Sequence, residues 1–275
     1  MPYSIYHFFK TLIENKKCFS EIEKLEDFPF NDAMLACKNA GQFPDLAIRL
    51  NTDDPLFTGG ELIELKDSQS YDVSSFNSTI PSGQKDIEKI IKGVNSSIKK
   101  QMEDAGNNIY SLKYRDVYYL IRGKQRNNIK IVLIHGSFFE TVSSHELISQ
   151  SFEKVLEEAI QKHNIELNEE TKSILLAMFS ERESFSKVRN IDKASVKLRF
   201  RVMTEVKTEA NILNKKQYPE IEDNTINLIV PLHGEKEILM QRFNAVFNVN
   251  EMEQYKIFAL KHHLNGYFLV FQISL

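Results

Sequence analysis

The chain has 275 residues, of which 42% are hydrophobic and 27% are charged, and this excludes a disordered or fibrous protein. Its formal net charge of -3 excludes a cationic field over the whole chain, so any binding of nucleic acid requires basic residues that gather locally. Cys18 and Cys37 are too few for a disulfide framework and lack metal-ligand spacing, which favours a reducing compartment and, by default, the cytoplasm.

The N-terminal residues 5–26 predict one or two amphipathic helices, because apolar side chains recur there at helical spacing. The segment lacks the pattern of a signal peptide, and no window is apolar for long enough to cross a bilayer, so we expect no membrane partner. Two short apolar runs, "PDLAIRL" at 44–50 and "GELIELK" at 60–66, are bounded by turn residues and predict neighbouring strands joined by a loop.

The rest of the chain continues to alternate helices and strands, and residues 82–106 predict an amphipathic helix. We expect strands on both sides of the basic turn 123–128, helices over 143–163 and 168–183, and strands within 195–206, 225–232 and 266–275. The pattern indicates an α/β (α+β) fold with a mixed central β-sheet flanked by helices. We predict a core over 1–142 and a C-terminal α/β elaboration over 143–275, packed on the core in one compact unit.

Three residues of the first two strands suggest chemistry. Side chains alternate between the faces of a strand, so Glu64 and Lys66 share one side while Glu61 and Leu65 point to the other. If the preceding strand pairs with this one, Asp45 at its head brings a second carboxylate to Glu64. Two carboxylates oriented together make an oxygen-ligand site for Mg²⁺. Such a metal lowers the pKa of a bound water and an adjacent lysine orients it, which points to phosphodiester hydrolysis.

The motif that holds these residues resembles the signature of the PD-(D/E)XK nuclease superfamily: Pro-Asp at Asp45, eighteen intervening residues, then Glu-Leu-Lys at Glu64–Lys66. The predicted order of helix, strand, strand, helix and strand over the first half of the chain is also similar to that core. In its size and its lack of helicase or ATPase motifs, the chain resembles type II restriction endonucleases within the superfamily. The resemblance implies a restriction-endonuclease-like core in which Asp45 and Glu64 hold Mg²⁺ and Lys66 assists the nucleophile.

The resemblance also implies an activity and partners. We expect a Mg²⁺-dependent endodeoxyribonuclease that cuts double-stranded DNA to leave a 5′-phosphate and a 3′-hydroxyl. A cognate methyltransferase would act on the same site without necessarily binding this chain. A single acid-acid-lysine set must cut two strands, so we expect a homodimer on a palindromic site. The second half of the chain, residues 143–275, is the natural source of dimer contacts and of elements that read the bases.

Several alternatives stay open. A repair or mobile-element nuclease of the same superfamily would act on a DNA structure rather than a sequence. In a non-catalytic DNA-binding or protein-binding module, the three residues would form only an ion-pair network. A second Glu-x-Lys triplet, Glu205–Lys207, lacks a Pro-Asp partner and is expected to be inert. A glutamate from the first helix is a frequent extra ligand in the superfamily, and Glu14 and Glu21 are equal candidates.

A polar stretch follows the predicted catalytic strand. Hydroxyl and amide side chains donate to phosphate oxygens and read base edges, which suits contact with DNA, although an ordinary polar loop capping the next helix is an equal alternative. The turn 124–127 is a weaker candidate for phosphate contact. The predicted DNA-binding residues are Ser68, Ser70, Ser74, Ser75, Asn77, Ser78, Thr79 and Lys85.

Two histidine-containing segments receive no catalytic role. "IHGSFFE" contains His135 and Ser137, but it has no nucleophile elbow and no dedicated acid, so we interpret it as a strand end and a turn. His262 and His263 are expected at the end of a helix, where neighbouring side chains point in different directions and do not bind a metal together.

Overall fold

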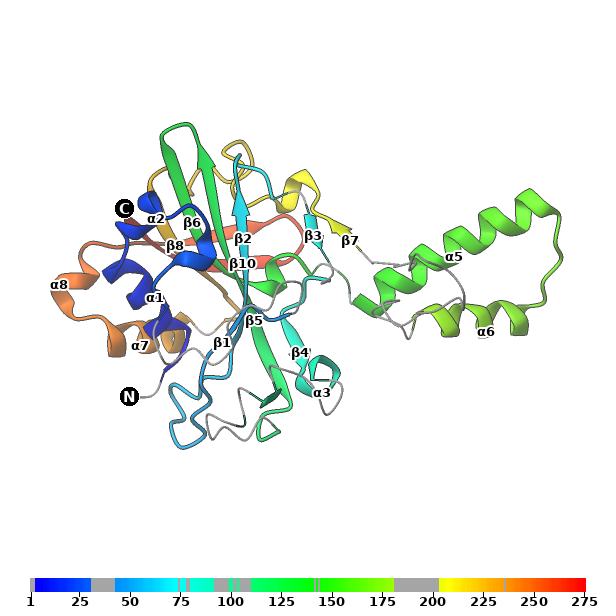
Figure 1. Ribbon diagram of the computed structural model, residues 1–275, viewed down its shortest axis with the longest axis horizontal. Helices are drawn as coiled ribbons and strands as arrows, with labels where there is room; N and C mark the ends of the chain where they lie inside the picture. The colour runs from blue at the N-terminus through cyan, green and yellow to red at the C-terminus, as the bar shows by residue number, and fades with distance from the viewer. Residues whose placement is uncertain are drawn as a thin grey trace, which may run out of the picture. The chain divides into compact units, whose positions relative to one another are not determined.

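The computed structural model of the chain contains two compact units (Figure 1). The first comprises Met1–Ser74, Gly83–Phe139 and Val206–Leu275, and the second comprises Ser75–Ser82 and Glu140–Glu205. The residues that the structure describes are 3–30, 43–73, 75–77, 80–91, 99–100, 103, 110–140, 142, 144–180, 203–234 and 236–275.

This division differs from the predicted one, which put a single boundary near residue 142 inside one compact unit. Residues 206–275 belong to the first unit because their strands hydrogen-bond into the same sheet as the N-terminal strands. The link is the parallel pairing of β8 (Thr225–Pro231) with β6 (Asn128–His135). The predicted C-terminal elaboration over 143–275 is therefore shared between the two units.

An eight-stranded mixed sheet forms the centre of the first unit. Its strand order is β1-β2-β5-β6-β8-β10-β9, and β4 pairs with β5 beside this path. β2 runs parallel to β5, as β6 does to β8, and the remaining pairs are antiparallel, which confirms the predicted mixed α/β fold. The other strands are β1 (Leu46–Ala47), β2 (Leu62–Ser68), β4 (Gln84–Asp86), β5 (Tyr114–Gln125), β9 (Lys256–His262) and β10 (Gly266–Ser274).

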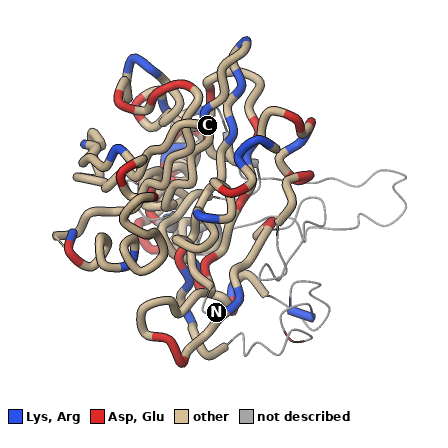
Figure 2. The backbone as a smooth tube through the Cα atoms, turned by 90° about the vertical axis from the view of Figure 1, so that its left-hand side faces the viewer, with Lys and Arg blue, Asp and Glu red and all other residues tan. Residues whose placement is uncertain are grey.

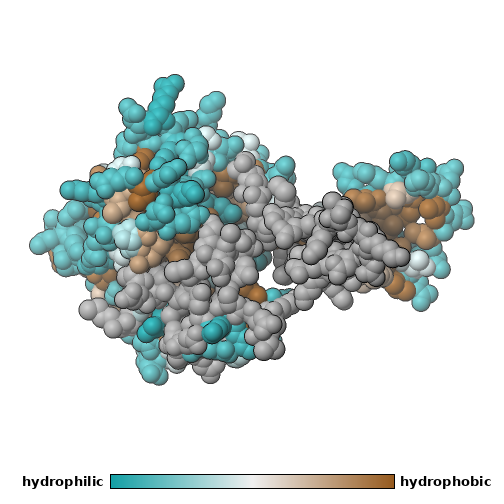
Figure 3. Space-filling view, viewed as in Figure 1, coloured by the Kyte–Doolittle hydropathy of each residue, from teal (hydrophilic) through white to brown (hydrophobic). Residues whose placement is uncertain are grey.

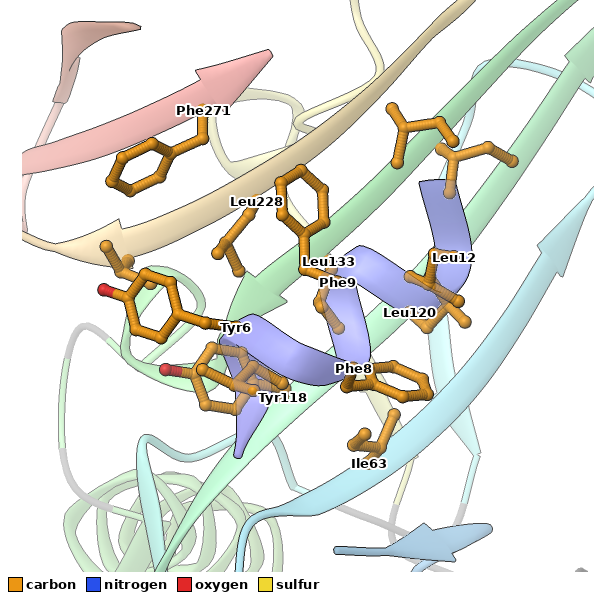
Figure 4. Close-up of a cluster of buried hydrophobic side chains, with 14 of the residues drawn as sticks. Tyr6, Phe8, Phe9, Leu12, Ile63, Tyr118, Leu120, Leu133, Leu228 and Phe271 are labelled. Carbon is orange, nitrogen blue, oxygen red and sulfur yellow. The ribbon is translucent and has the colours of Figure 1, made fainter. Parts of the chain in front are cut away.

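Helix α1 (Ile5–Glu14) covers one face of this sheet. Its Phe8 and Phe9 are fully buried, and they share one hydrophobic cluster with Ile63 of β2, Leu120 of β5 and Leu133 of β6 (Figure 4). Each strand contributes alternate residues to the cluster, because strand side chains alternate between the two faces. Burial of each such side chain contributes about 1.5–3 kcal/mol, which holds α1 on this face.

The remaining helices of the first unit are short, apart from α7. The predicted N-terminal helices are present as α1 and α2 followed by the 3₁₀ turn η1. The predicted helix over 82–106 begins as α3, which Asp86 caps by accepting a hydrogen bond from the amide of Glu88 at 3.0 Å; residues 92–98 lie outside the described ranges. These elements are α2 (Cys18–Glu21), η1 (Leu25–Asp27), α3 (Ile87–Ile90), η2 (Gly136–Phe138), η3 (Thr208–Ala210), α7 (Lys236–Val246) and α8 (Val249–Met252).

The opposite face of the sheet is covered by η2 and by the segment before β8. The ring of Phe138 lies 5.1 Å from that of Phe268 in β10 and 5.5 Å from that of Tyr218, measured between centroids. Lys130 of β6 donates to the carbonyl of Leu213 at 3.4 Å on the same face, and burial lowers its pKa to about 8. The sheet is thus buried on both faces over its central strands.

The expected helix before His262 is wrong. Residues 256–262 form strand β9, and His262 ends that strand. Its Nδ1 accepts hydrogen bonds from the amides of Leu264 at 3.1 Å and Asn265 at 2.9 Å, so the ring caps the turn into β10. Pairing with β10 provides the backbone hydrogen bonds of the run Ile-Phe-Ala-Leu, so these residues form a strand.

The second unit contains the helices α5 (Ser144–His163) and α6 (Glu169–Ser180), both of which the sequence predicts. Lys172 of α6 lies 3.3 Å from Glu153 and 3.4 Å from Glu157 of α5, so ion pairs join the two helices. The unit also contains a two-stranded sheet of β3 (Ser75–Asn77) and β7 (Met203–Glu205), while the rest of the strand predicted within 195–206 lies largely outside the described ranges. Within the part of the chain that is described, no helix combines the length and apolarity needed to span a bilayer.

Candidate active site

The acid pair lies on the hairpin formed by β1 and β2. Leu46 pairs with Ile63 and Ala47 with Leu62, so extending this antiparallel register by one residue puts Asp45 opposite Glu64. Asp45 is 2% exposed and Glu64 is 8% exposed. Two carboxylates are therefore buried in opposed positions on the hairpin at the edge of the sheet.

Hydrogen bonds and an ion pair fix the geometry of the site. Asp45 Oδ2 accepts a hydrogen bond from the backbone amide of Leu65 at 2.8 Å, which holds this carboxylate against β2. Lys66 Nζ lies 3.4 Å from Glu64 Oε1, on the same face of the strand. The structure thus brings together all three residues of the predicted catalytic set.

The two faces of β2 have different roles. Ile63 and Leu65 belong to the hydrophobic cluster beneath α1, so Glu64 and Lys66 point to the other face. α1 and α2 lie on the first of these faces, and the structure does not bring Glu14 or Glu21 to the acid pair. Within the described ranges, no group of three or more histidine, cysteine, aspartate or glutamate residues is placed to hold a metal.

The donor set still suits Mg²⁺. This ion prefers oxygen ligands, keeps several waters, and is usually held by one or two carboxylates together with substrate phosphates. Asp45 and Glu64 supply two such carboxylates in a buried position. A third protein ligand is not required by this chemistry.

The predicted DNA-binding residues are dispersed. Ser68 ends β2, and its hydroxyl bonds to the carbonyls of Ser70 and Asp72, so it shapes the following loop. Lys85 lies with its Nζ 5.5 Å from the ring centroid of Phe43, two residues before Asp45. Lys85 is therefore next to the chain segment that holds the acid pair.

The remaining residues of that predicted set lie in the second unit or outside the described residues. Ser75 and Asn77 form part of β3, where they pair with Glu205 and Met203 of β7 in the second unit. Ser74, Ser78 and Thr79 lie outside the described residues. Their contact with DNA stays a prediction.

The second Glu-x-Lys triplet has a different setting. Glu205 and Lys207 are exposed, and the boundary between the two units falls between them. Lys207 precedes η3 as its N-cap residue. This triplet lacks the buried, opposed carboxylate that Asp45 provides to Glu64.

Sequence reasoning missed a group of polar residues on the α1 face. Asp116 Oδ1 lies 3.8 Å from His135 Nε2, so the segment "IHGSFFE" does have an acid beside its histidine, contrary to expectation. Burial alone would raise the pKa of Asp116, but hydrogen bonding to His135 and Gln84 holds it below its usual value. Ser137 bonds to His135 Nδ1 through its hydroxyl at 2.8 Å and its amide at 3.3 Å, which is the geometry of a cap on η2.

No local signal in the sequence could have revealed this group, because strand pairing brings its members together. β5 and β6 are antiparallel neighbours, and Tyr118 pairs with His135 at the end of the ladder. Along the chain the described elements run α1, α2, η1, β1, β2, β3, β4, α3 and β5, so two further strands, β3 and β4, separate β2 from the helix that the sequence predicts directly after it. No protein-family model, no curated protein and no solved structure matches this chain.

Proposed function

We propose that the chain is a Mg²⁺-dependent endodeoxyribonuclease in which Asp45 and Glu64 bind the metal and Lys66 acts beside them. The observation that carries the proposal is the buried pair of opposed carboxylates with Lys66 Nζ 3.4 Å from Glu64 Oε1. A bound Mg²⁺ would supply Lewis acidity toward a phosphate oxygen and would lower the pKa of a water ligand.

The three side chains have distinct tasks in this proposal. The hydrogen bond from the amide of Leu65 fixes the Asp45 carboxylate against β2, which holds this group in place for a cation. Glu64 supplies the other carboxylate and aligns the ammonium of Lys66. Lys66 then orients the attacking water, and its charge stabilises the negative charge that develops on the phosphate.

Digestion of a fully sequenced phage DNA tests the proposal directly. The protein is incubated with Mg²⁺ or with EDTA, and the fragment ends are sequenced. Cleavage that requires Mg²⁺ and leaves 5′-phosphate ends supports a nuclease. Intact DNA in both reactions contradicts it.

The narrower proposal is a type II restriction endonuclease of the cytoplasm, paired with a methyltransferase that modifies the same site. The resemblance of the Asp45 and Glu64–Lys66 motif supports it. Discrete fragments with a common terminal motif are expected, and prior methylation of that motif should prevent cleavage. A smear of fragments would favour the repair or mobile-element alternative.

One observation also favours a non-catalytic alternative. The contact between Lys66 and Glu64 is itself an ion pair, with side-chain exposures of 19% and 10%. A buried ion pair can simply be structural, and removal of one partner then destabilises the fold strongly. Absence of Mg²⁺-dependent nicking, together with unfolding of a Lys66→Met variant, would establish this alternative.

The affinity for DNA is expected to fall steeply with salt. Positive and negative residues are interspersed along the described backbone (Figure 2), so phosphate contacts require local cations such as Lys85. Each neutralised phosphate releases condensed counterions, and a protein with 6–10 such contacts loses roughly 10³–10⁵-fold in affinity between 50 and 200 mM salt. Fluorescence anisotropy with a labelled duplex in Ca²⁺ measures this slope. A nearly flat slope would indicate a protein-binding module instead.

A homodimer remains our proposal for cutting both strands. Hydrophobic residues gather on the α5–α6 hairpin of the second unit (Figure 3), where Val155, Ile174 and Met178 are 60%, 55% and 57% exposed. Large apolar side chains exposed together mark association surfaces. Sedimentation of a Glu64→Gln variant on a short cognate duplex should show two protomers per duplex. One protomer, with both strands still cut in a single binding event by the wild type, would contradict the dimer.

A further inference from the structure

A polar cavity of about 520 Å³ opens on the first unit, on the α1 face of the sheet. Residues from the start of α1, from the segment before β2, from β5 and from α7 line it, among them Tyr6, Glu61 and Arg242. Glu61 precedes β2 and lies on the α1 side together with Ile63 and Leu65, because residues two apart along a strand share a face. Glu64 and Lys66 point to the opposite side. The cavity is therefore separate from the candidate active site. Its volume is typical of small-molecule sites, which span roughly 300–1,000 Å³.

Four buried polar atoms in the wall of this cavity have no hydrogen-bond partner among the described residues. They are Ser4 Oγ, Tyr6 Oη, Glu61 Oε2 and Arg242 Nε. Ser4 is only 4% exposed and Tyr6 only 2%, so bulk solvent does not reach them freely. Buried polar groups nearly always have a partner, and four that line one cavity indicate that its occupant provides hydrogen bonds.

The structure orients these groups. Glu61 Oε1 accepts a hydrogen bond from the amide of Ile5 at 3.2 Å, at the first turn of α1, whereas Oε2 is buried and has no hydrogen-bond partner among the described residues. The hydroxyls of Tyr6 and Tyr118 point the same way beneath α1 (Figure 4), and both residues line the cavity. Burial raises the pKa of Glu61 to about 7, while Arg242 opposes this rise. Glu61 and Arg242 both line this cavity.

The polar groups of the cavity indicate which donors and acceptors its ligand must carry. A carboxylate accepts hydrogen bonds and a guanidinium donates them, so the ligand must carry donors for Glu61 beside acceptors for Arg242. Phe57 and Tyr114 add aromatic surface to the same wall, which suits a planar ring. Guanine combines these features, since its exocyclic amino group donates while O6 and N7 accept, and arginine is the usual partner of O6 and N7.

We propose that this cavity is a binding site for a free guanine nucleoside, with Glu61 accepting from the amino edge of the base and Arg242 donating to its carbonyl edge. The hydroxyls of Ser4 and Tyr6 complete the hydrogen bonds. The site lies on the face of the sheet opposite Glu64, so it is independent of DNA hydrolysis.

Isothermal titration of the full chain with guanosine tests the proposal, with adenosine and cytidine as comparators. Saturable binding of guanosine at one site per chain is expected, at least about tenfold tighter than either comparator, because the amino and carbonyl edges are placed differently in those bases. Equal affinity for the three nucleosides, or heats no larger than those of dilution at millimolar guanosine, would overturn the assignment and leave water as the occupant.

Variants locate the site. Glu61→Gln retains an acceptor for the amide of Ile5 but loses the carboxylate, so guanosine should bind about tenfold or more weakly. Arg242→Met should weaken binding without changing the contacts of Glu61 to α1. Glu64→Gln is the matched control on the opposite face and should bind guanosine as the wild type does. If Glu64→Gln weakens binding as much as Glu61→Gln while both stay folded by near-UV circular dichroism, the cavity is not the site.

The pH dependence provides a second readout. Between pH 6 and pH 8 the wild type should bind guanosine more tightly as pH rises, because the Glu61 carboxylate becomes ionised around pH 7. Asp116, His135, His233, Tyr118 and Arg242 also face the cavity. The difference between the wild type and Glu61→Gln isolates Glu61 from this set, and identical pH profiles would contradict its role.

Discussion

Replacement of Glu64 by glutamine is expected to reduce Mg²⁺-dependent cleavage of DNA by at least about 10²-fold while the protein stays folded. Glutamine has the shape of glutamate, so packing of the 8% exposed side chain against the sheet is retained. The variant loses one of two anionic metal ligands and the partner that aligns Lys66 at 3.4 Å. Nicking of supercoiled plasmid, followed over time at several Mg²⁺ concentrations, measures the effect. Near-normal rates would remove Glu64 from the site.

Asp45 must be replaced with more care, because its carboxylate has a structural bond as well. Oδ2 accepts from the buried amide of Leu65 at 2.8 Å, so Asp45→Ala leaves that amide without its acceptor and costs about 1–3 kcal/mol of stability. Asp45→Asn retains an acceptor and separates loss of activity from loss of folding. The same nicking assay should show both variants to be inactive, with only the alanine variant unfolding at a lower urea concentration.

Glu205→Gln and Lys207→Ala are the matched controls for these variants. They alter the same Glu-x-Lys pattern, but both residues are exposed and the second triplet has no opposed buried acid. Cleavage should be unchanged in each. Loss of activity in Lys207→Ala would show that the second triplet, rather than the first, contributes to catalysis.

The part of the candidate site that the sequence predicts follows from the alternation of side chains along strands. The separation of Glu64 and Lys66 from Ile63 and Leu65 follows from a period of two, and the structure has this arrangement because the apolar pair is buried under α1. The opposition of Asp45 and Glu64 follows once two short neighbouring strands pair antiparallel. These are local relations, within reach of pattern reasoning.

The remaining features depend on contacts between distant segments. β8 enters the sheet beside β6, yet 89 residues separate His135 from Thr225, including most of the second unit. No composition change marks the ends of that unit, whose longer segment runs from Glu140 to Glu205, whereas the sequence predicts a single boundary near residue 142. The cavity around Glu61 and Arg242 is likewise assembled from elements at both ends of the chain.

Asp67→Ala is expected to destabilise the first unit by about 3–5 kcal/mol, the usual cost of leaving a buried charge unpaired. Arg122 is fully buried, its Nε donates to Asp67 Oδ1 at 2.7 Å, and a second bond joins its Nη2 to Asp67 Oδ2. The same aspartate accepts from the amide of Leu25 at 3.0 Å, so it also ties η1 to β2. Urea unfolding monitored by circular dichroism measures the change.

An exposed ion pair and a double variant complete this test. Glu222 and Lys256 are 2.6 Å apart with side-chain exposures of 55% and 57%, so Glu222→Ala should cost less than about 1 kcal/mol. Replacing Arg122 by methionine and Asp67 by leucine removes both charges, but it also removes the Arg122 donors to the carbonyls of Phe19, Ile22 and Glu23, of which Ile22 keeps a second donor, Lys124. The double variant should therefore recover only part of the lost stability. Full recovery would show that these carbonyls find other partners and that the unpaired charge alone causes the loss.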